Sequence, residues 1–286
     1  MDIIAYQGVK GAYSEQACKN AFSNMQTVAC NTFQEAMWMV EQGDAKLAMI
    51  PLENSTAGRV EEIYRLIPKM SLHVVGEHFE PVEHCLVGTK DSDMDTIKYV
   101  SSHPQALAQC HLNISKLGLK AQAKLDTAGA AQEISSLNDP SHAAIASRLA
   151  AKLYDLKILK CNFEDIQGNI TRFFILSKNS EIPKFSKKDA YITSLLFQVR
   201  NIPAALYKAL GGFATNGINL LKLESYTPSG TLRASQFHID IDAHIDTKEM
   251  KFALEELNFF AQDVRVLGTY KKHNYRYSDK LDSVVG

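Results

Sequence analysis

The chain has 286 residues, of which 45% are hydrophobic and 22% are charged, and its formal net charge is −1 at pH 7. That length allows two domains, each with its own hydrophobic core. The balanced charge leaves no electrostatic footprint for nucleic acid, and no apolar run reaches the roughly 18 residues that a transmembrane helix needs. With no secretion signal after Met1, we expect a cytoplasmic protein without a nucleic-acid or membrane partner.

The cysteines are odd in number and scattered, and none forms a Cys-x-x-Cys pair: Cys18, Cys30, Cys85, Cys110 and Cys161. This pattern is typical of reduced thiols in a cytoplasm rather than of a disulfide framework. The histidines include no His-Glu-x-x-His motif. We therefore expect neither a metal site nor a cofactor.

In the first part of the chain, predicted strands alternate with predicted helices. Gly8 and Gly11 permit a tight turn, and Ser14 is expected to cap the helix that follows. Hydrophobic periodicity predicts strands at residues 1–6, 47–50, 97–100, 119–125 and 143–146, and helices at residues 14–22, 33–43, 59–67, 106–117, 127–137 and 147–156. This alternation predicts an α/β fold built on mostly parallel sheets.

Four polar turns each follow a predicted strand and open a predicted helix. In α/β sheets such turns line the carboxyl edge of the strands, where ligands bind. Helix N-termini at this edge carry free N–H groups and partial positive charge, so they suit carboxylates and phosphates. We expect the donors at Ser14, Ser55 and Pro104 to face one cleft.

Residues 168–176 open with a turn signal and continue as an apolar strand long enough to be buried. This strand places the hydroxyl of Thr171 beside the guanidinium of Arg172, where the chain completes the first domain. A Thr-Arg pair is also an ordinary solvated strand entry, so the pair alone does not identify a site.

A lysine-rich linker at residues 178–189 separates the first part from a smaller second part. Beyond the linker we predict strands at residues 191–199, 218–223, 234–241 and 264–267, and helices at residues 203–213 and 246–260. The order βαββαβ over about 85 residues is the ferredoxin-like arrangement.

Five motifs, in this order along the chain, make the first part resemble the prephenate dehydratase family: Gly11-Ala12-Tyr13-Ser14-Glu15-Gln16-Ala17, Pro51-Leu52-Glu53-Asn54-Ser55, Ser102-His103-Pro104-Gln105-Ala106-Leu107, Asp126-Thr127-Ala128 and Asn169-Ile170-Thr171-Arg172-Phe173. Each motif is weak alone, but the five in sequence are specific. The second part resembles that family's regulatory ACT domain, through Asn201-Ile202-Pro203-Ala204-Ala205-Leu206, Ile218-Asn219-Leu220 and Glu224-Ser225.

The resemblance covers nearly the entire chain and implies two domains. The first, residues 1–180, would be a catalytic domain with a two-lobed, type II periplasmic-binding-like α/β fold. Its lobes would be residues 1–76 with 160–180, and residues 77–159, with the substrate in the cleft between them. The second, residues 190–275, would be a ferredoxin-like ACT regulatory domain.

The resemblance further implies that prephenate loses water and carbon dioxide to give phenylpyruvate, on the route to phenylalanine, with Thr171 as the essential catalytic hydroxyl. Because prephenate is a dianion, Arg172 is expected to bind one carboxylate through two hydrogen bonds. The expected substrate-binding residues are Arg172, Phe173, Asn54, Ser55, Ser14, Ser102, Gln105, Thr127 and Glu53.

Simpler roles stay open for several of these residues. Glu53 could cap a strand end, His103 could be a helix N-cap, and Phe173 could belong to the core. The polar residues of the turns could serve only to satisfy turn backbones.

In the second part, the resemblance implies that L-phenylalanine binds at an interface of a homodimer or homotetramer and inhibits the enzyme. The expected effector-binding residues are Asn201, Ala204, Ala205, Leu206, Asn219, Leu220, Glu224 and Ser225. Two departures leave the strength of inhibition open. Tyr226-Thr227 replaces the family's Arg-Pro, with the proline displaced to Pro228, and Ala204 stands where glycine is usual.

Two other functions stay open. Arogenate dehydratase performs the same chemistry on the transaminated substrate, and only a few pocket contacts would distinguish the two substrates. A non-catalytic ligand sensor would share the cleft and the amino-acid-binding domain, although the chain has no DNA-binding segment.

Overall fold

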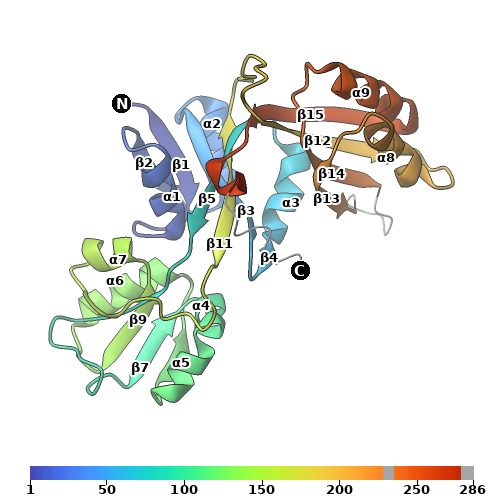
Figure 1. Ribbon diagram of the computed structural model, residues 1–286. Coiled ribbons are helices and arrows are strands. Elements are labelled where there is room, and N and C mark those ends of the chain that lie inside the picture. Colours follow the sequence, from blue (N-terminus) through green and yellow to red (C-terminus); the bar gives the residue numbers. More distant parts are fainter. Residues whose placement is uncertain (228–234, 278–286) are drawn as a thin grey trace. The chain divides into compact units, whose positions relative to one another are not determined.

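The computed structural model describes residues 1–227 and 235–277 and divides into two compact units (Figure 1). The first unit contains Met1–Ile63 and His78–Phe173, and the second contains Tyr64–Glu77 and Phe174–Gly286. Residues 64–77, expected in the first domain, thus cluster with the second unit. Pro228 and Ala234, the first residue of a predicted strand, lie outside the described residues.

The first sheet has the strand order β2-β1-β3-β11-β5, with β4 paired to β3. Its strands are β1 (Ile3–Gln7), β2 (Gln26–Cys30), β3 (Leu47–Asn54), β4 (Gly58–Arg59), β5 (His73–Pro81) and β11 (Ile170–Ser177). Its helices are α1 (Tyr13–Ala21), α2 (Phe33–Gln42) and α3 (Glu61–Leu66), followed by the 3₁₀ turn Ile67–Lys69. Strand β1 pairs in parallel with both β2 and β3. Strands β5 and β11 each have residues in both units.

The second sheet of the first unit has the order β10-β6-β9-β7-β8. Its strands are β6 (Cys85–Gly88), β7 (Tyr99–Ser102), β8 (Lys120–Ala123), β9 (His142–Ala146) and β10 (Lys157–Lys160). Its helices are α4 (Pro104–Gln109), α5 (His111–Lys116), α6 (Thr127–Leu137) and α7 (Arg148–Leu153). The chain enters this sheet after β5 and returns from it through β11, as Figure 1 shows.

Both sheets are mixed rather than mostly parallel, which corrects the sequence prediction. Strand β6 pairs antiparallel with both β10 and β9, whereas β9 and β7 are parallel. The α/β class is confirmed. Five strands had no prediction (β2, β4, β5, β6 and β10), and the helix predicted over residues 106–117 is broken at Cys110 into α4 and α5.

Local chemistry explains why the helices begin and end where they do. Thr32 accepts a hydrogen bond from the backbone N–H of Glu35, and the Glu35 carboxylate accepts from the N–H of Asn31, so α2 opens with a capping box. Gly43, with φ of 88°, ends the same helix. Helix α1 starts one residue earlier than predicted, with Ala12 at the N-cap position, so Ser14 does not cap it.

The second unit has the predicted order of elements, βαββαβ. The elements are β12 (Tyr191–Val199), α8 (Ala205–Thr215), β13 (Leu220–Tyr226), β14 (Gln236–Ile241), α9 (Lys248–Phe260) and β15 (Ala261–Lys271), followed by the 3₁₀ turn Asn274–Tyr277. The sheet order is β13-β14-β12-β15, with antiparallel pairing throughout. Leu195, Phe197, Phe213 and Leu257 are among the residues of its core, which contains side chains from the sheet and both helices.

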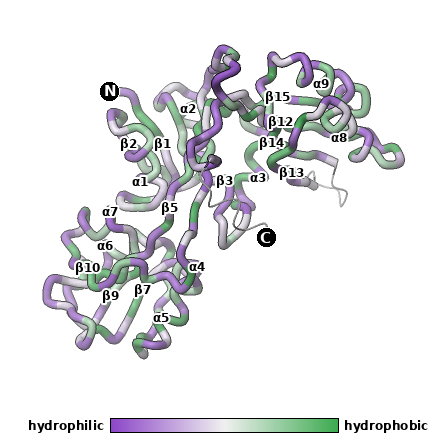
Figure 2. Tube along the Cα trace, viewed as in Figure 1, coloured by the Kyte–Doolittle hydropathy of each residue, from purple (hydrophilic) through white to green (hydrophobic). Residues whose placement is uncertain are grey.

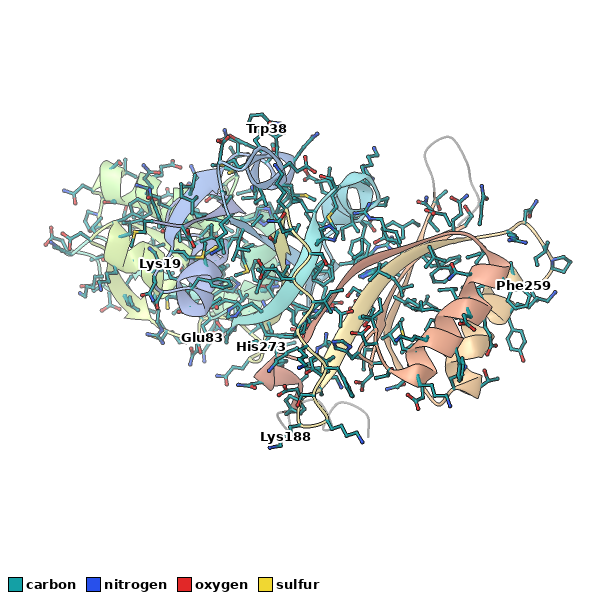
Figure 3. All side chains as sticks on the ribbon, turned by 90° about the horizontal axis from the view of Figure 1, so that it is seen from above. Lys19, Trp38, Glu83, Lys188, Phe259 and His273 are labelled. Atoms are coloured by element: carbon teal, nitrogen blue, oxygen red, sulfur yellow. The ribbon has the colours of Figure 1, made fainter. Side chains whose placement is uncertain are left out.

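The segment between β11 and β12 is mostly hydrophilic, as expected for a linker (Figure 2). Trp38 on α2 and Phe259 on α9 point outward (Figure 3) and are 52% and 70% exposed, so neither belongs to a core. Within the described residues, no helix has both the length and the apolar composition that crossing a bilayer requires.

Candidate active site

A cavity of about 390 Å³ lies within the first unit. Its lining contains the start of α1, the turn after β3 and the start of β11, all from the first sheet and its helices. The second sheet contributes His84, just before β6, and the starts of α4 and α6. The cavity therefore combines turns and helix N-termini from two sheets, as expected for the carboxyl edge of strands.

Thr171 lines this cavity, and its hydroxyl is held by the side-chain amide of Asn54. Asn54 Nδ2 donates to Thr171 Oγ1 at 2.9 Å. The orientation of the amide is fixed because Asn54 Oδ1 accepts from the backbone N–H groups of Thr56 and Ala57, at 3.1 and 3.0 Å. Since Thr171 Oγ1 accepts this bond, its own O–H is directed to a different acceptor.

The bond to Thr171 is the last of a chain of hydrogen bonds. Thr56 Oγ1 donates to Asn54 Oδ1 at 2.8 Å, and Gln109 Nε2 donates to Thr56 Oγ1 at 2.7 Å. Gln109 Oε1 then lies 2.8 Å from His84 Nε2, and His84 Nδ1 lies 2.9 Å from the hydroxyl of Tyr13. Every donor in this chain points toward Thr171, and bonds aligned in this way polarise one another.

The protonation state of His84 decides which groups donate in the hydrogen bonds on either side of it. Burial lowers the pKa of His84, the largest effect, while its bond to Gln109 and the charge of Glu164 act in the opposite direction. The neutral imidazole must carry its hydrogen on Nε2, because Gln109 Oε1 is only an acceptor. Nδ1 can then only accept, so the single proton of the Tyr13 hydroxyl is shared between Nδ1 and the carbonyl of Glu83, which lies 2.8 Å away. Burial raises the pKa of Tyr13, so this hydroxyl keeps its proton.

Backbone contacts hold the two sides of the cavity in register. Ser55 N–H donates to the carbonyl of Ile170 at 2.9 Å, and Ser55 Oγ accepts from the N–H of Ile170 at 3.0 Å, which ties the turn after β3 to the start of β11. On the other side, Ser147 Oγ donates to the carbonyl of Gly11 at 2.7 Å. Gly11 has a φ of 90°, and a Cβ there would lie 3.0 Å from Cα of Ala150, so the close approach requires glycine.

Three helices present their first turns to the cavity. Tyr13 and Ser14 of α1, Gln105 of α4 and Thr127 of α6 all line it. His103 is the N-cap of α4, since its Nδ1 accepts from the N–H of Gln105 at 3.2 Å. Arg59 is the cationic side chain of the lining, and its Nε lies 2.6 Å from Glu61 Oε1. The lining also contains the carboxylate of Asp126, the N-cap of α6, which accepts from the N–H of Gly129 at 2.6 Å. Apart from that carboxylate, the helix dipoles and the guanidinium suit an anionic ligand.

The structure brings together six of the residues that the sequence singled out: Thr171, Phe173, Asn54, Ser14, Gln105 and Thr127. Four others are absent from the lining. Arg172 is 3% exposed and lies 3.0 Å from Glu53 Oε1, so the expected binding of a substrate carboxylate by Arg172 is not supported. Glu53 is its ion-pair partner, and Ser102 is buried with its hydroxyl on the carbonyl of Ile145. Ser55 fastens the turn, as described above.

Four lining residues were not singled out from the sequence: Tyr13, His84, Gln109 and Asn169, whose Nδ2 donates to Gln109 Oε1 at 3.2 Å. Tyr13 and Asn169 stand inside two of the motifs, and alternation along β11 places Asn169, Thr171 and Phe173 on one face, with Arg172 on the other. His84 and Gln109 carry no local signal, because they reach the cavity only through the second sheet.

The expected effector residues lie at the start of α8 and along β13 in the second unit. Asn201, Ala204, Asn219 and Ser225 are exposed, whereas Leu206 and Leu220 pack against the core. Glu224 forms an ion pair with Lys222 at 3.0 Å. Ala204 has a φ of 55°, in the left-handed region that favours glycine.

Comparison with known proteins identifies consistent relatives. The family model described as prephenate dehydratase matches residues 4–181. A bifunctional N-acyl-homoserine lactone acylase/prephenate dehydratase of Komagataeibacter europaeus is 43% identical, over 96% of this chain and 97% of that protein. Arogenate dehydratase/prephenate dehydratase 2 of Arabidopsis thaliana is 40% identical, over 93% of this chain and 72% of that protein. The crystal structure of a prephenate dehydratase from Arthrobacter aurescens in complex with L-Phe superposes with a TM-score of 0.87 at 25% identity, covering 99% of both chains.

Proposed function

Because the chain belongs to the prephenate dehydratase family, we propose that it removes water and carbon dioxide from prephenate to form phenylpyruvate, as a lyase of phenylalanine biosynthesis. The reaction needs no redox step. The electron pair of the ring–carboxylate bond moves into the ring, the carboxylate leaves as carbon dioxide, and the ring hydroxyl leaves with a proton as water.

The hydrogen-bond chain that ends at Thr171 is the observation that carries this proposal. It leaves the Thr171 O–H as a donor directed away from Asn54, suited to the leaving hydroxyl of the substrate. A positioned proton donor contributes about 10²–10⁴-fold to a rate. Threonine is a weak acid, so we assign it hydrogen bonding and relay rather than full ionisation.

Charge in the cavity agrees with a dianionic substrate that loses one carboxylate. The side-chain carboxylate, which is retained, is assigned to Arg59 and the first turns of α1, α4 and α6. The ring carboxylate must become neutral carbon dioxide, so a strong ion pair on it would oppose the reaction. A neutral His84 beside Gln109 avoids that ion pair.

The relatives favour arogenate as a second candidate substrate, since several of them are arogenate dehydratases. Arogenate differs from prephenate by an amine in place of the side-chain ketone. The ratio of kcat/KM on the two substrates assigns the preference.

For the second unit, the βαββαβ order and the L-Phe complex of the Arthrobacter aurescens relative support an ACT domain that binds L-phenylalanine and inhibits the first unit. The exposure of Asn201, Ala204, Asn219 and Ser225 agrees with a site completed by a second copy, in a homodimer or homotetramer. In this proposal the first unit has the two-lobed, type II periplasmic-binding-like fold. The protein acts in the cytoplasm and uses no cofactor.

A direct assay tests the proposal. Purified protein is incubated separately with prephenate, with arogenate and with an N-acyl-homoserine lactone. The lactone is included because the name of the Komagataeibacter europaeus relative contains a lactone acylase activity. We expect prephenate to be converted to phenylpyruvate, which is measured by its absorbance in alkali. We also expect millimolar L-phenylalanine to inhibit this conversion. No product from prephenate or arogenate at micromolar enzyme would contradict the proposal and leave a ligand sensor as the better account.

A further inference from the structure

Two of the five cysteines, Cys85 and Cys161, occupy facing positions on neighbouring strands of the second sheet. Strand β10 pairs antiparallel with β6, with Lys160 opposite Leu86. The next step of this register places Cys161, directly after β10, opposite Cys85, the first residue of β6. Facing residues of an antiparallel pair have Cα atoms about 4.5–5.5 Å apart, within the about 4.4–6.8 Å that a disulfide spans.

Both side chains lie on the same face of the sheet. Cys85 belongs to the core cluster that contains Val87, Ala146 and Ala150, and Cys161 packs against this same cluster. Leu86, between Cys85 and Val87 in the sequence, belongs to the cluster on the opposite face. The two thiols therefore face each other with no change in strand register. The pKa of the Cys85 thiol agrees with this contact, because burial and the neighbouring Cys161 raise it to about 12.

The two cysteines differ in exposure and in charged surroundings. Cys85 is fully buried, whereas Cys161 is partly exposed and accepts a hydrogen bond of 3.1 Å from Arg148 Nη1. Arg148 is half exposed, and its Nε lies 3.6 Å from Glu83, whose carboxylate offsets part of the positive charge (Glu83 is labelled in Figure 3). Arg148 therefore places a hydrogen-bond donor and a positive charge on Cys161, which is the sulfur of the pair that solvent reaches.

We propose that Cys85 and Cys161 are an oxidisable thiol pair, in which a hydroperoxide oxidises Cys161 and Cys85 then closes a disulfide between β6 and the end of β10. In the first step the Cys161 thiolate attacks a peroxide oxygen, the O–O bond breaks, and hydroxide leaves and takes a proton to form water. In the second step the Cys85 sulfur attacks the Cys161 sulfenic acid, the S–O bond breaks, and the hydroxyl leaves as water with the proton of Cys85. Two thiols and one hydrogen peroxide give one disulfide and two waters.

The other three cysteines provide internal controls. Cys18, Cys30 and Cys110 are buried, and burial is the main cause that raises the pKa of each thiol. Only the Cys85–Cys161 pair, among the cysteines of the described chain, has both a facing thiol and a guanidinium donor.

The test uses the full-length reduced protein, with hydrogen peroxide as the oxidant, followed by alkylation, digestion and mass spectrometry. We expect a linked peptide pair carrying Cys85 and Cys161, two hydrogens lighter than the sum of the free peptides, with the other cysteines alkylated. Because the bond closes a long loop, the oxidised protein should melt at least about 5 °C higher, and dithiothreitol should reverse the shift. Neither readout depends on the substrate.

Three variants separate this pair from nonspecific oxidation. Arg148→Gln should slow oxidation of Cys161 at least about fivefold, because the thiolate loses its donor. Cys85→Ala should leave Cys161 as a sulfenic acid that dimedone traps, and Cys30→Ser should still form the linked pair. Wild-type protein in which Cys161 resists peroxide, or links to any cysteine other than Cys85, would overturn the proposal, as would an unchanged rate in Arg148→Gln.

Discussion

The side-chain amide of Asn54 donates a 2.9 Å hydrogen bond to the hydroxyl oxygen of Thr171, although the two residues lie 117 positions apart in the sequence. Two backbone N–H groups hold the amide so that its Nδ2 faces Thr171 as a donor, while Nδ2 also donates to Asn169 Oδ1 at 2.6 Å. The direction of this one bond decides where the Thr171 proton points. The proposed chemistry depends on that direction.

Replacing Asn54 by aspartate should reverse the bond without altering the turn. A carboxylate keeps the acceptors for the N–H groups of Thr56 and Ala57, but it takes the Thr171 proton for itself. We expect kcat to fall about 100-fold or more, with a smaller change in KM, in steady-state assays. The exposed Asn179→Asp is the matched control and should behave as wild type. Equal kcat in both variants would show that the donor at Asn54 is not needed.

His84 should make stability fall on mild acidification. Its pKa is lowered by burial in the folded protein, so the unfolded chain, with a pKa near about 6.5, binds the proton first. The free energy of unfolding that depends on neutral His84 is therefore fully present above about pH 6.5. It declines as the pH falls from there toward the lowered pKa of His84. Urea unfolding at pH 7.5 and 5.5 should show a larger loss of unfolding free energy in wild type than in His84→Gln. The same loss in both proteins would remove His84 as the cause.

Two arginines should separate binding from folding. Arg59 lines the cavity and is partly exposed, so Arg59→Gln should raise KM about tenfold while leaving the free energy of unfolding nearly unchanged. Arg172 is buried beside Glu53, so Arg172→Gln should lower the free energy of unfolding by about 3 kcal/mol, because it removes the positive charge of a largely buried ion pair. Urea unfolding and steady-state kinetics on both variants check this. A raised KM with intact stability in Arg172→Gln would restore the role that the sequence suggested.

In the second unit, Gly268 should tolerate no side chain. A Cβ at this position of β15 would lie 1.8 Å from the carbonyl oxygen of Val74. Gly268→Ala should therefore destabilise the protein by about 2–3 kcal/mol. The matched control is Gly211→Ala in α8, where a Cβ meets no atom within 4 Å and helix propensity improves by about 0.5–1 kcal/mol. The Tm should fall for Gly268→Ala and rise for Gly211→Ala. A Tm unchanged by Gly268→Ala would contradict the close approach of Gly268 to Val74.

The elements that the sequence predicted well are those whose signals are local. Thr32 and Glu35 form the capping box that starts α2, and the βαββαβ order follows from hydrophobic alternation and helical periodicity. Strand β2 was missed because only one of its five residues, Cys30, is buried, so hydrophobic alternation is weak there. The break between α4 and α5 at Cys110 has neither proline nor glycine to announce it.

The candidate site was predictable in part for the same reason. Thr171, Asn54 and Thr127 stand in distinctive motifs, at the start of β11, the end of β3 and the start of α6, and all three line the cavity. Arg172 lies on the other face of β11 from Thr171, buried beside Glu53, because alternation along a strand puts neighbouring residues on opposite faces. The contacts of His84 and Gln109 depend on how the two sheets meet, and no local pattern records that.

The most direct test of the hydrogen-bond chain compares Thr171→Val and Thr171→Ser with wild type on prephenate. Valine keeps the shape of threonine but has no hydroxyl, whereas serine keeps the donor. We predict that Thr171→Val lowers kcat by about 10²–10⁴-fold with KM within a few-fold of wild type, and that Thr171→Ser stays within about tenfold of the wild-type kcat. A kcat for Thr171→Val close to that of wild type, in folded protein, would contradict the account.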